Sequence, residues 1–261
     1  MIESLQSPHV GRVKALIGSR GSKERNDSGL FVAEGVQSLR EALTSQSGPA
    51  IETLYLSPAG ATRIGELDIS EVNVVEVSDA VMQEMASTVT PQGILMVCSI
   101  PAYSLAELNI TPESFVIYLD RIQDPGNAGT ILRSADAFGA RAVITSPGSV
   151  DMYSPKVVRS TAGSLWHIPV FEALELKELM AHMDTAECIV LSSHASESIV
   201  NFRSSAPCIA IFGNEGVGTS TNQLAINART VAIPMSGQAE SLNLSAAASI
   251  VMFTLSQSSR G

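Results

Sequence analysis

Arg133 is the side chain whose position in this sequence most invites chemistry. It lies within 128–138, where the other residues are mostly small or apolar and their spacing predicts a helix. A guanidinium on such a helix is costly unless it faces a partner or a ligand. Asn127 precedes this helix at a position suited to a cap. Arg133 is therefore a candidate site residue, while Asn127 is either a site residue or a simple cap.

A glycine-rich loop, 213–218, directly follows an apolar run that predicts a buried strand. A phosphate-binding P-loop needs a lysine where this chain has Thr219, and the glycine order G-x-x-G-x-G is not the G-x-G-x-x-G of dinucleotide-binding folds. Glu215 also places a negative charge in the loop. The loop therefore favours a neutral or cationic ligand, with an exposed structural turn as the alternative.

A third segment, 231–248, combines an apolar run, a polar loop and an alanine-rich helix. Ser241 or Asn243 is suited to cap that helix. The small residues of 245–249 would let another backbone approach closely, which suits tight packing as much as ligand contact.

Strands and helices alternate along the chain, which predicts an α/β fold with a mostly parallel sheet. Ligands in such sheets bind beyond the carboxyl ends of the strands, where all three loops would lie. We expect a small α/β domain over 1–100, a linker over 101–113 and a second domain over 114–261. The expected strands are 29–33, 51–56, 72–77, 93–99, 115–119, 142–145, 188–192, 208–212 and 230–233. The expected helices are 35–43, 79–85, 128–138, 155–162, 174–183, 221–228 and 244–255.

Charge is unevenly distributed along the 261 residues. The 26 acidic residues outnumber the 16 Lys and Arg, and the net charge of −10 is too acidic for a protein whose whole surface binds nucleic acid. The basic residues near the start form a local cluster, which is either a solvated helix face or a phosphate-binding footprint. The members of this cluster are Arg12, Lys14, Arg20, Lys23 and Arg25.

Several protein classes are excluded by composition. The apolar runs are much shorter than the roughly 18 residues of a membrane span, and the first residues lack a secretory signal, so we expect a cytoplasmic protein. Cys98, Cys188 and Cys208 each lie within an apolar run, where a thiol behaves as a small buried hydrophobe. Neither a disulfide framework nor a metal site is expected.

The three loops together resemble the three sequence motifs of the SPOUT superfamily, specifically the TrmH (SpoU) family of RNA ribose 2′-O-methyltransferases. The first motif corresponds to Asp124-Pro125-x-Asn127-x-Gly129 with Arg133, and the second to 213–218. The third corresponds to 233–235 and Ser241-Leu242-Asn243-x-Ser245. The motifs occur in family order, and the resemblance covers 114 to the carboxyl end. Residues 1–100 more loosely resemble the ribosomal-protein-L30e-like substrate-binding domain.

The resemblance implies a deep trefoil knot in the second domain and a homodimer that builds each active site across the subunit interface. It also implies transfer of a methyl group from S-adenosylmethionine, without a metal, to an RNA ribose. The expected substrate is 23S ribosomal RNA, with tRNA as the alternative, and a catalytically silent RNA-binding protein is a further alternative. RNA would bind to the basic cluster and first domain, and single-stranded or looped RNA suits a target ribose that must be presented outside a regular helix.

The resemblance also implies the roles of individual residues. Arg133 would activate the 2′-hydroxyl. A free guanidinium keeps its proton at ordinary pH and so cannot readily act as a base. Arg133 would therefore act either as a base assisted by a bound phosphate or by stabilising the developing oxyanion. Its expected companions in catalysis are Asn127, Glu215, Ser241 and Asn243. The expected donor-binding residues are Gly213, Asn214, Gly218, Ile233, Met235 and Leu242.

Overall fold

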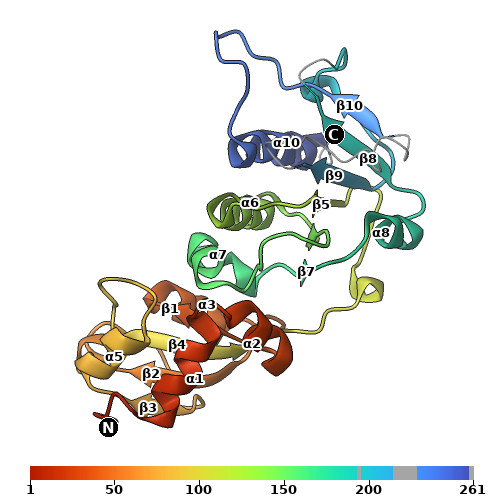
Figure 1. The fold of residues 1–261 in the computed structure, drawn as a ribbon. Helices are drawn as coiled ribbons and strands as arrows, with labels where there is room; N and C mark the ends of the chain where they lie inside the picture. The colour runs from red at the N-terminus through yellow and green to blue at the C-terminus, as the bar shows by residue number, and fades with distance from the viewer. Residues whose placement is uncertain (193–194, 214–227, 259–261) are drawn as a thin grey trace. The chain divides into compact units, whose positions relative to one another are not determined.

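The computed structural model describes residues 1–192, 195–213 and 228–258 of the chain. The chain folds into two compact units (Figure 1). Unit 1 comprises 1–102 and 151–167, whereas unit 2 comprises 103–150 and 168–261. In the part of the chain that is described, each helix is too short or too polar to cross a membrane.

Unit 1 is built on a four-stranded sheet with the order β1-β4-β2-β3. β4 lies inside the sheet and runs antiparallel to both β1 and β2, whereas β2 and β3 are parallel. All four strands lie within the ranges expected from the sequence or within one residue of them. Their bounds are β1 Leu30–Glu34, β2 Ile51–Leu56, β3 Val74–Glu76 and β4 Ile94–Ser99.

The basic segment at the start of the chain is helical, with α1 at Pro8–Ile17 and α2 at Gly21–Ser28. The α1 helix buries Val10, Val13 and Leu16 in the unit 1 core, so its cations lie on a helix with an apolar inner face. The remaining unit 1 helices are α3 Val36–Thr44, α4 Pro58–Ala61, α5 Asp79–Met85 and α7 Pro155–Ser160.

Residues 151–167 belong to unit 1 although we expected them in the second domain. The rings of Tyr153 and Trp166 pack against Phe31 of β1, with centroid distances of 5.1 and 6.2 Å. Trp166 Nε1 donates a hydrogen bond to the carbonyl of Pro49 at 2.9 Å. Aromatic packing between residues more than a hundred positions apart thus makes this unit discontinuous in sequence.

Unit 2 contains a six-stranded sheet with the order β10-β8-β9-β5-β6-β7, and each of its pairings is parallel. The two central strands, β9 and β5, are buried throughout. This arrangement confirms the predicted parallel α/β fold. The strands are β5 Phe115–Leu119, β6 Val143–Thr145, β7 Val170–Phe171, β8 Glu187–Leu191, β9 Cys208–Phe212 and β10 Arg229–Val231.

Helices cover both faces of the unit 2 sheet (Figure 1). The α6 helix, Pro125–Phe138, and the α10 helix, Leu244–Ser258, lie on one face, and α8, Leu176–His182, lies on the other. The expected linker contains a 3₁₀ turn at Leu105–Glu107 that packs beside α8 in unit 2. The expected helix 221–228 lies outside the described residues, apart from its last position.

Candidate functional site

The candidate site lies at the carboxyl edge of the unit 2 sheet. Because the strands are parallel, the loops that follow β5, β8, β9 and β10 all leave from this edge. The register shows that the strand ends are aligned, since Leu119 pairs with Phe212 and Leu191 pairs with Val231. The described parts of the three sequence motifs therefore converge here.

The α6 helix begins three residues earlier than expected, and its cap is Asp124 rather than Asn127. The Asp124 side chain accepts a hydrogen bond from the backbone N–H of Asn127 at 2.7 Å, and Pro125 occupies the first helical turn. The interpretation of Asn127 as a cap is therefore wrong. Its side chain is not needed to cap the helix and extends toward another motif.

Asn243 caps the α10 helix and also contacts α6. Its Oδ1 accepts hydrogen bonds from the backbone N–H of Ser245 at 2.9 Å and of Ala246 at 3.3 Å. Its Nδ2 donates to Asn127 Oδ1 at 3.1 Å. Of the two caps considered for this helix, Asn243 is the one that forms, and its amide joins the first motif to the third.

Small residues bring α6 and α10 together about two turns further along. Ser249 donates its hydroxyl hydrogen to the carbonyl of Ser245 at 2.7 Å. The 2.8 Å contact between Ser134 and Ser249 hydroxyls therefore has Ser134 as the donor, because a hydroxyl has only one hydrogen. Ala248 is fully buried nearby. Residues 245–249 thus serve helix packing, one of the two interpretations of their small size.

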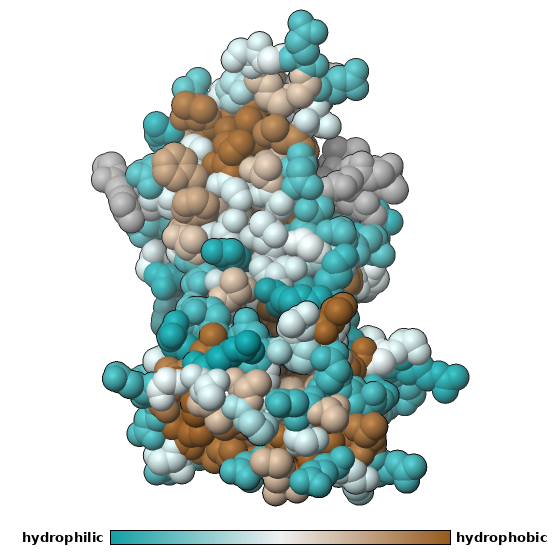
Figure 2. All heavy atoms as spheres, turned by 90° about the vertical axis from the view of Figure 1, so that its left-hand side faces the viewer, coloured by the Kyte–Doolittle hydropathy of each residue, from teal (hydrophilic) through white to brown (hydrophobic). Residues whose placement is uncertain are grey.

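A pocket of about 480 Å³ opens beside the start of α10. Its walls are mostly apolar, and Figure 2 shows apolar side chains gathered in this upper part of unit 2. Three predicted donor-binding residues, Ile233, Met235 and Leu242, line it, as does Ser241. The full lining is Leu191, Ser192, Ile233, Met235, Glu240, Ser241, Leu242, Asn243, Leu244 and Ala247.

Sequence reasoning missed some of the pocket residues. Leu191 and Ser192 come from the end of β8, which carries no recognised motif, although a polar residue directly after a parallel strand is a signal for this edge. Glu240 ends the loop 236–240, which the resemblance places near the donor without giving this residue a role of its own. It is the only charged residue among the described residues that line the pocket. The pocket can therefore enclose an apolar ligand that carries positive charge.

Arg133 projects to solvent from α6. Among the residues that the structure describes, it has no hydrogen bond or ion pair, and it is not part of the pocket lining. Of the two expectations for this charge, a partner or a ligand, the first is not met by the described residues of the chain. An exposed guanidinium on α6 remains available to a ligand or to another chain.

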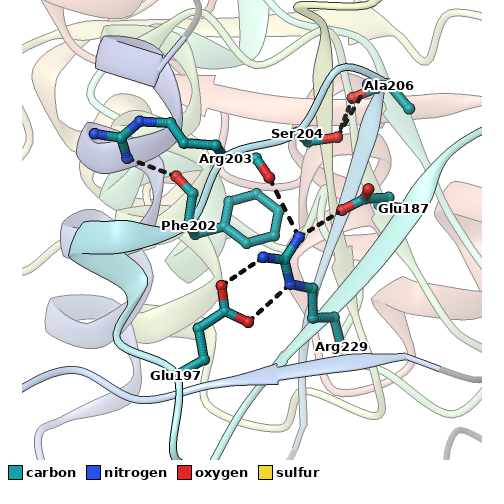
Figure 3. Close-up of polar contacts among 7 residues, drawn as sticks. All are labelled: Glu187, Glu197, Phe202, Arg203, Ser204, Ala206 and Arg229. Atoms are coloured by element: carbon teal, nitrogen blue, oxygen red, sulfur yellow. Dashed lines mark hydrogen bonds and ion pairs between the residues drawn. The ribbon is translucent and has the colours of Figure 1, made fainter.

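Arg229 of β10 is at the centre of a group of polar contacts (Figure 3). Its guanidinium donates two hydrogen bonds to Glu197, at 2.6 and 2.7 Å, and one to Glu187 at 3.2 Å. It also lies 4.7 Å from the centre of the Phe202 ring. Hydrogen bonding from Arg229 lowers the pKa of Glu197. Because Arg229 lies in β10, these contacts anchor the strand that leads to Ile233.

Ion pairs neutralise most of the cations in the predicted RNA-binding cluster. Arg12 contacts Glu52 at 2.8 Å, Lys14 contacts Glu84, and Lys23 contacts Asp27. These pairs are exposed and therefore stabilise the fold little. Arg20 is also exposed and has no ion pair with the described residues.

Arg25 must be removed from the predicted RNA-binding residues. It is only 4% exposed, and its Nε and Nη2 donate to Asp151 at 2.9 and 2.6 Å. Its Nη1 donates to the carbonyl of Leu16. The side chain is thus a buried structural connection between α2 and residues 151–167.

The remaining sequence predictions have mixed outcomes. Asn214, Glu215 and Gly218 lie outside the described residues, whereas Gly213 directly follows β9 as expected. Cys98, Cys188 and Cys208 are all buried, which confirms that they are core residues, and this burial raises the pKa of their thiols. Among the described ranges, no group of His, Cys, Asp or Glu is arranged to hold a metal ion.

Two protein-family models match the chain. Residues 114–253 match the SpoU rRNA Methylase family, and residues 10–96 match the MRM3-like substrate binding domain. The first match contains the pocket, Arg133 and the Asn127–Asn243 contact. It also spans 151–167, so the family segments and the compact units divide the chain differently.

Relatives and solved structures are similar to almost the whole chain. A Bacillus subtilis protein named 23S rRNA (guanosine(2553)-2′-O)-methyltransferase RlmP is 33% identical over 97% of this chain and 98% of its own. A Streptomyces viridochromogenes 23S rRNA (uridine(2479)-2′-O)-methyltransferase is 29% identical over 92% and 86%. The crystal structure of the SpoU methyltransferase AviRb from the same species, in complex with the cofactor AdoMet, covers 97% of this chain and 98% of its own, with 26% identity and a TM-score of 0.83.

Proposed function

Since this chain belongs to the SpoU rRNA methylase family, we propose that it transfers a methyl group from S-adenosylmethionine to a ribose 2′-hydroxyl of 23S ribosomal RNA. The observation that carries this proposal is the pocket at the carboxyl edge of the unit 2 sheet, lined by residues of the third motif. We assign 114–261 to methyl transfer and 1–100 to substrate binding. The trefoil knot implied by the family stays a prediction.

The pocket residues fit S-adenosylmethionine in size and chemistry. A volume of about 480 Å³ is within the usual range for small-molecule sites. Ile233, Met235 and Leu242 offer apolar contacts to the adenosine portion, and Glu240 offers a carboxylate to a cationic group. When bound, the donor supplies a methyl group on a positively charged sulfur. No metal is required for this chemistry.

We assign the ribose end of the site to the Asn127–Asn243 contact and the neighbouring Ser241. Asn243 fixes the start of α10 next to the pocket, and its hydrogen bond to Asn127 fixes the distance between α10 and α6. Correct positioning of two reactants can lower a barrier by roughly 7 to 11 kcal/mol. Glu215, Asn214 and Gly218 keep their assigned roles as predictions, since they lie outside the described residues.

Arg133 is the proposed catalytic residue that activates the 2′-hydroxyl. As the 2′-oxygen bonds to the methyl carbon, the bond from that carbon to the donor sulfur would break to leave S-adenosylhomocysteine, and the hydroxyl proton would pass to a bound phosphate or to solvent. A nearby guanidinium stabilises the negative charge that develops on that oxygen. Arg133 is exposed on α6, and no described residue of the same chain neutralises it. The electrostatic mechanism uses this positive charge directly. In the alternative mechanism Arg133 would first have to give a proton to a bound phosphate before it could act as a base.

We further propose that the protein is a cytoplasmic homodimer in which a second copy contributes to each site. Exposed apolar side chains on α10 support this proposal, because Phe253 is 53% exposed and Ile250 is 38% exposed. The Phe253 ring packs at 5.8 Å from that of Phe138 on α6, so the apolar surface spans both helices. Light scattering should give the mass of a dimer, and Phe253→Asp should shift it toward a monomer.

The choice of ribosomal RNA rests on the names of the relatives. Both relatives described above act on 23S rRNA, and one acts on a guanosine whereas the other acts on a uridine. The family therefore constrains the substrate class more strongly than the base. A tRNA substrate and a silent RNA-binding protein are the competing functions.

Calorimetric titration with S-adenosylmethionine, followed by transfer of labelled methyl groups to unmodified 23S rRNA and to tRNA, tests the proposal. We expect donor binding and 2′-O-methylation of 23S rRNA. Label in tRNA alone would keep the chemistry and change the substrate. Absence of donor binding by the folded protein would contradict the enzyme assignment and favour an RNA-binding protein.

A further inference from the structure

The segment between α5 and β4, residues 86–92, is firmly anchored to unit 1. The Glu34 carboxylate accepts hydrogen bonds from the backbone N–H and hydroxyl of Ser87, at 2.8 and 2.6 Å, and from the hydroxyl of Thr88 at 2.9 Å. At the other end, Gln92 Oε1 accepts from the first backbone N–H of α3 at 3.0 Å. The segment therefore presents a defined surface to solvent.

Val89 lies at the exposed middle of this anchored segment. Val89 is 92% exposed, and its carbonyl accepts a hydrogen bond from the Gln83 side chain at 3.2 Å. An apolar side chain with almost no contact to its own domain does not stabilise that domain by burial. It can gain burial only from a partner, and the apolar face of an unstacked RNA base offers such a surface.

Two cations of α7 lie beside this segment. Arg159 Nη1 donates a hydrogen bond to the Ser87 hydroxyl at 3.1 Å, which brings α7 next to 86–92. Lys156 is three residues earlier on the same helix, so the two side chains lie on neighbouring positions of one face. Both residues are exposed.

The α7 cations differ in their electrostatic state from most cations of the basic cluster. Lys156 and Arg159 have no ion pair with any residue in the described ranges, whereas Arg12, Lys14 and Lys23 each have a carboxylate partner. Arg20 is the one exposed member of the basic cluster that has no ion pair with the described residues. In a chain of net charge −10, the long-range field does not attract RNA, so local unpaired cations matter most. Lys156 and Arg159 can therefore bind phosphate without first breaking an ion pair to a described residue.

We propose that α7 and residues 86–92 form the RNA-docking surface of unit 1, in place of the basic cluster. Lys156 and Arg159 bind phosphates of an unpaired RNA strand, and Val89 packs against one of its bases. This inference rests on the proposed function, because it names the surface that holds the proposed substrate. It moves the main phosphate contacts from α1 and α2 to α7.

Filter binding of the full-length protein to 23S rRNA transcribed in vitro tests this surface. Lys156→Glu combined with Arg159→Glu should weaken binding at least tenfold at moderate salt. It should also reduce the slope of log K against log salt by about 1.4, because about 0.7 is lost for each phosphate contact on a single strand. Lys156→Arg with Arg159→Lys keeps both charges and should bind within about threefold of the parent.

The matched control is Lys14→Glu combined with Lys23→Glu, which changes the net charge equally. We expect this control to weaken binding less than threefold. Equal or greater weakening by the control would return RNA binding to the basic cluster and overturn the proposal. Thermal unfolding of all variants checks that unit 1 is folded.

Val89 gives an independent test that does not involve charge. Val89→Ser should weaken binding several-fold with an unchanged salt slope, because no phosphate contact is removed. Donor affinity, measured by calorimetry, should be the same in every variant. If the parent binds the donor and methylates 23S rRNA but the α7 and Val89 variants bind RNA as the parent does, only this inference fails. If the parent neither binds the donor nor methylates RNA, the proposed function fails.

Discussion

Asn243 Nδ2 donates a hydrogen bond to Asn127 Oδ1 at 3.1 Å across 116 residues of sequence. The same Asn243 side chain accepts from the first backbone N–H groups of α10 through its Oδ1. The two roles use different atoms of one amide, so the capping bonds determine which atom faces Asn127. A local capping interaction thereby orients a long-range contact between two motifs.

The two roles of Asn243 can be separated by substitution. Asn243→Ser keeps a good helix cap but is too short to reach Asn127, whereas Asn243→Ala removes both interactions. We expect both variants to lower kcat/KM for methyl transfer at least tenfold. Only Asn243→Ala should lower the free energy of unfolding, by about 1 kcal/mol. Urea unfolding and methyl-transfer assays measure the two effects; full activity in Asn243→Ser would show that the contact is not needed.

Arg133→Ala should abolish methyl transfer while donor affinity stays within about twofold of the parent. The physical reason is that Arg133 is absent from the lining of the donor pocket but carries an exposed positive charge on α6. Calorimetry with S-adenosylmethionine and single-turnover methylation provide the two readouts. Arg133→Lys is the charge-conserving control and should retain more activity than Arg133→Ala. A fully active Arg133→Ala variant would remove this residue from catalysis.

Most strands of unit 2 could be predicted from sequence because parallel strands buried on both faces are continuous apolar runs. β5 at Phe115–Leu119 and β9 at Cys208–Phe212 have the bounds expected from those runs. The start of α6 could not be placed by the same reasoning, since Asp124 and Asn127 are both good capping residues. The hydrogen bond from the Asn127 N–H to Asp124 decides between them only in the folded chain.

Long-range packing explains the other differences from the sequence predictions. A cluster of basic residues gives no indication of which member is buried, and Arg25 is buried because Asp151 lies beside it after folding. Ser192 belongs to the pocket because β8 pairs with β10, which is far from it in sequence. Motif resemblance identified the third-motif residues of the pocket. The burial of Arg25 depends instead on packing within unit 1, and the place of Ser192 in the pocket depends on the order of the strands.

Arg25→Ala should destabilise unit 1 far more than a comparable change in an exposed pair. Removing one partner of a buried ion pair leaves the other charge without compensation, and such changes cost about 3 to 5 kcal/mol. The Asp151 carboxylate would be left in this state. Arg12→Ala, in the exposed pair with Glu52, is the matched control and should cost less than about 1 kcal/mol. Calorimetric melting measures both; equal effects would contradict the structural role of Arg25.

Arg229→Met should change how stability depends on pH in the acid range. Because Arg229 lowers the pKa of Glu197, the unfolded chain binds more protons near the ordinary pKa of about 4.3. The pair therefore stabilises the protein above that pH, and this contribution is lost as pH falls through the lower, folded pKa. We expect the urea midpoint of Arg229→Met to fall less steeply between about pH 6 and pH 3 than that of the parent.

Arg203 provides the control for this comparison. It follows the 3₁₀ turn Ile199–Asn201, close to Arg229. Among the described residues, its side chain donates to the backbone carbonyls of Val200 and Phe202, at 3.0 and 2.7 Å, and to no carboxylate. Arg203→Met should therefore leave the acid dependence unchanged. If both variants flatten the curve equally, the effect does not come from the Glu197 carboxylate.

Glu240→Gln should weaken binding of the cationic donor more than binding of its uncharged fragments. Glu240 is the only charged residue among the described residues lining the pocket, so it is the group that can distinguish ligand charge there.

Calorimetry with three ligands locates the charge that Glu240 contacts. S-adenosylmethionine carries a sulfonium and an ammonium, S-adenosylhomocysteine carries the ammonium alone, and methylthioadenosine carries neither. Weaker binding of the first two ligands indicates the ammonium, and weaker binding of the first alone indicates the sulfonium. Equal weakening of all three would show that Glu240 shapes the pocket without contacting either charge.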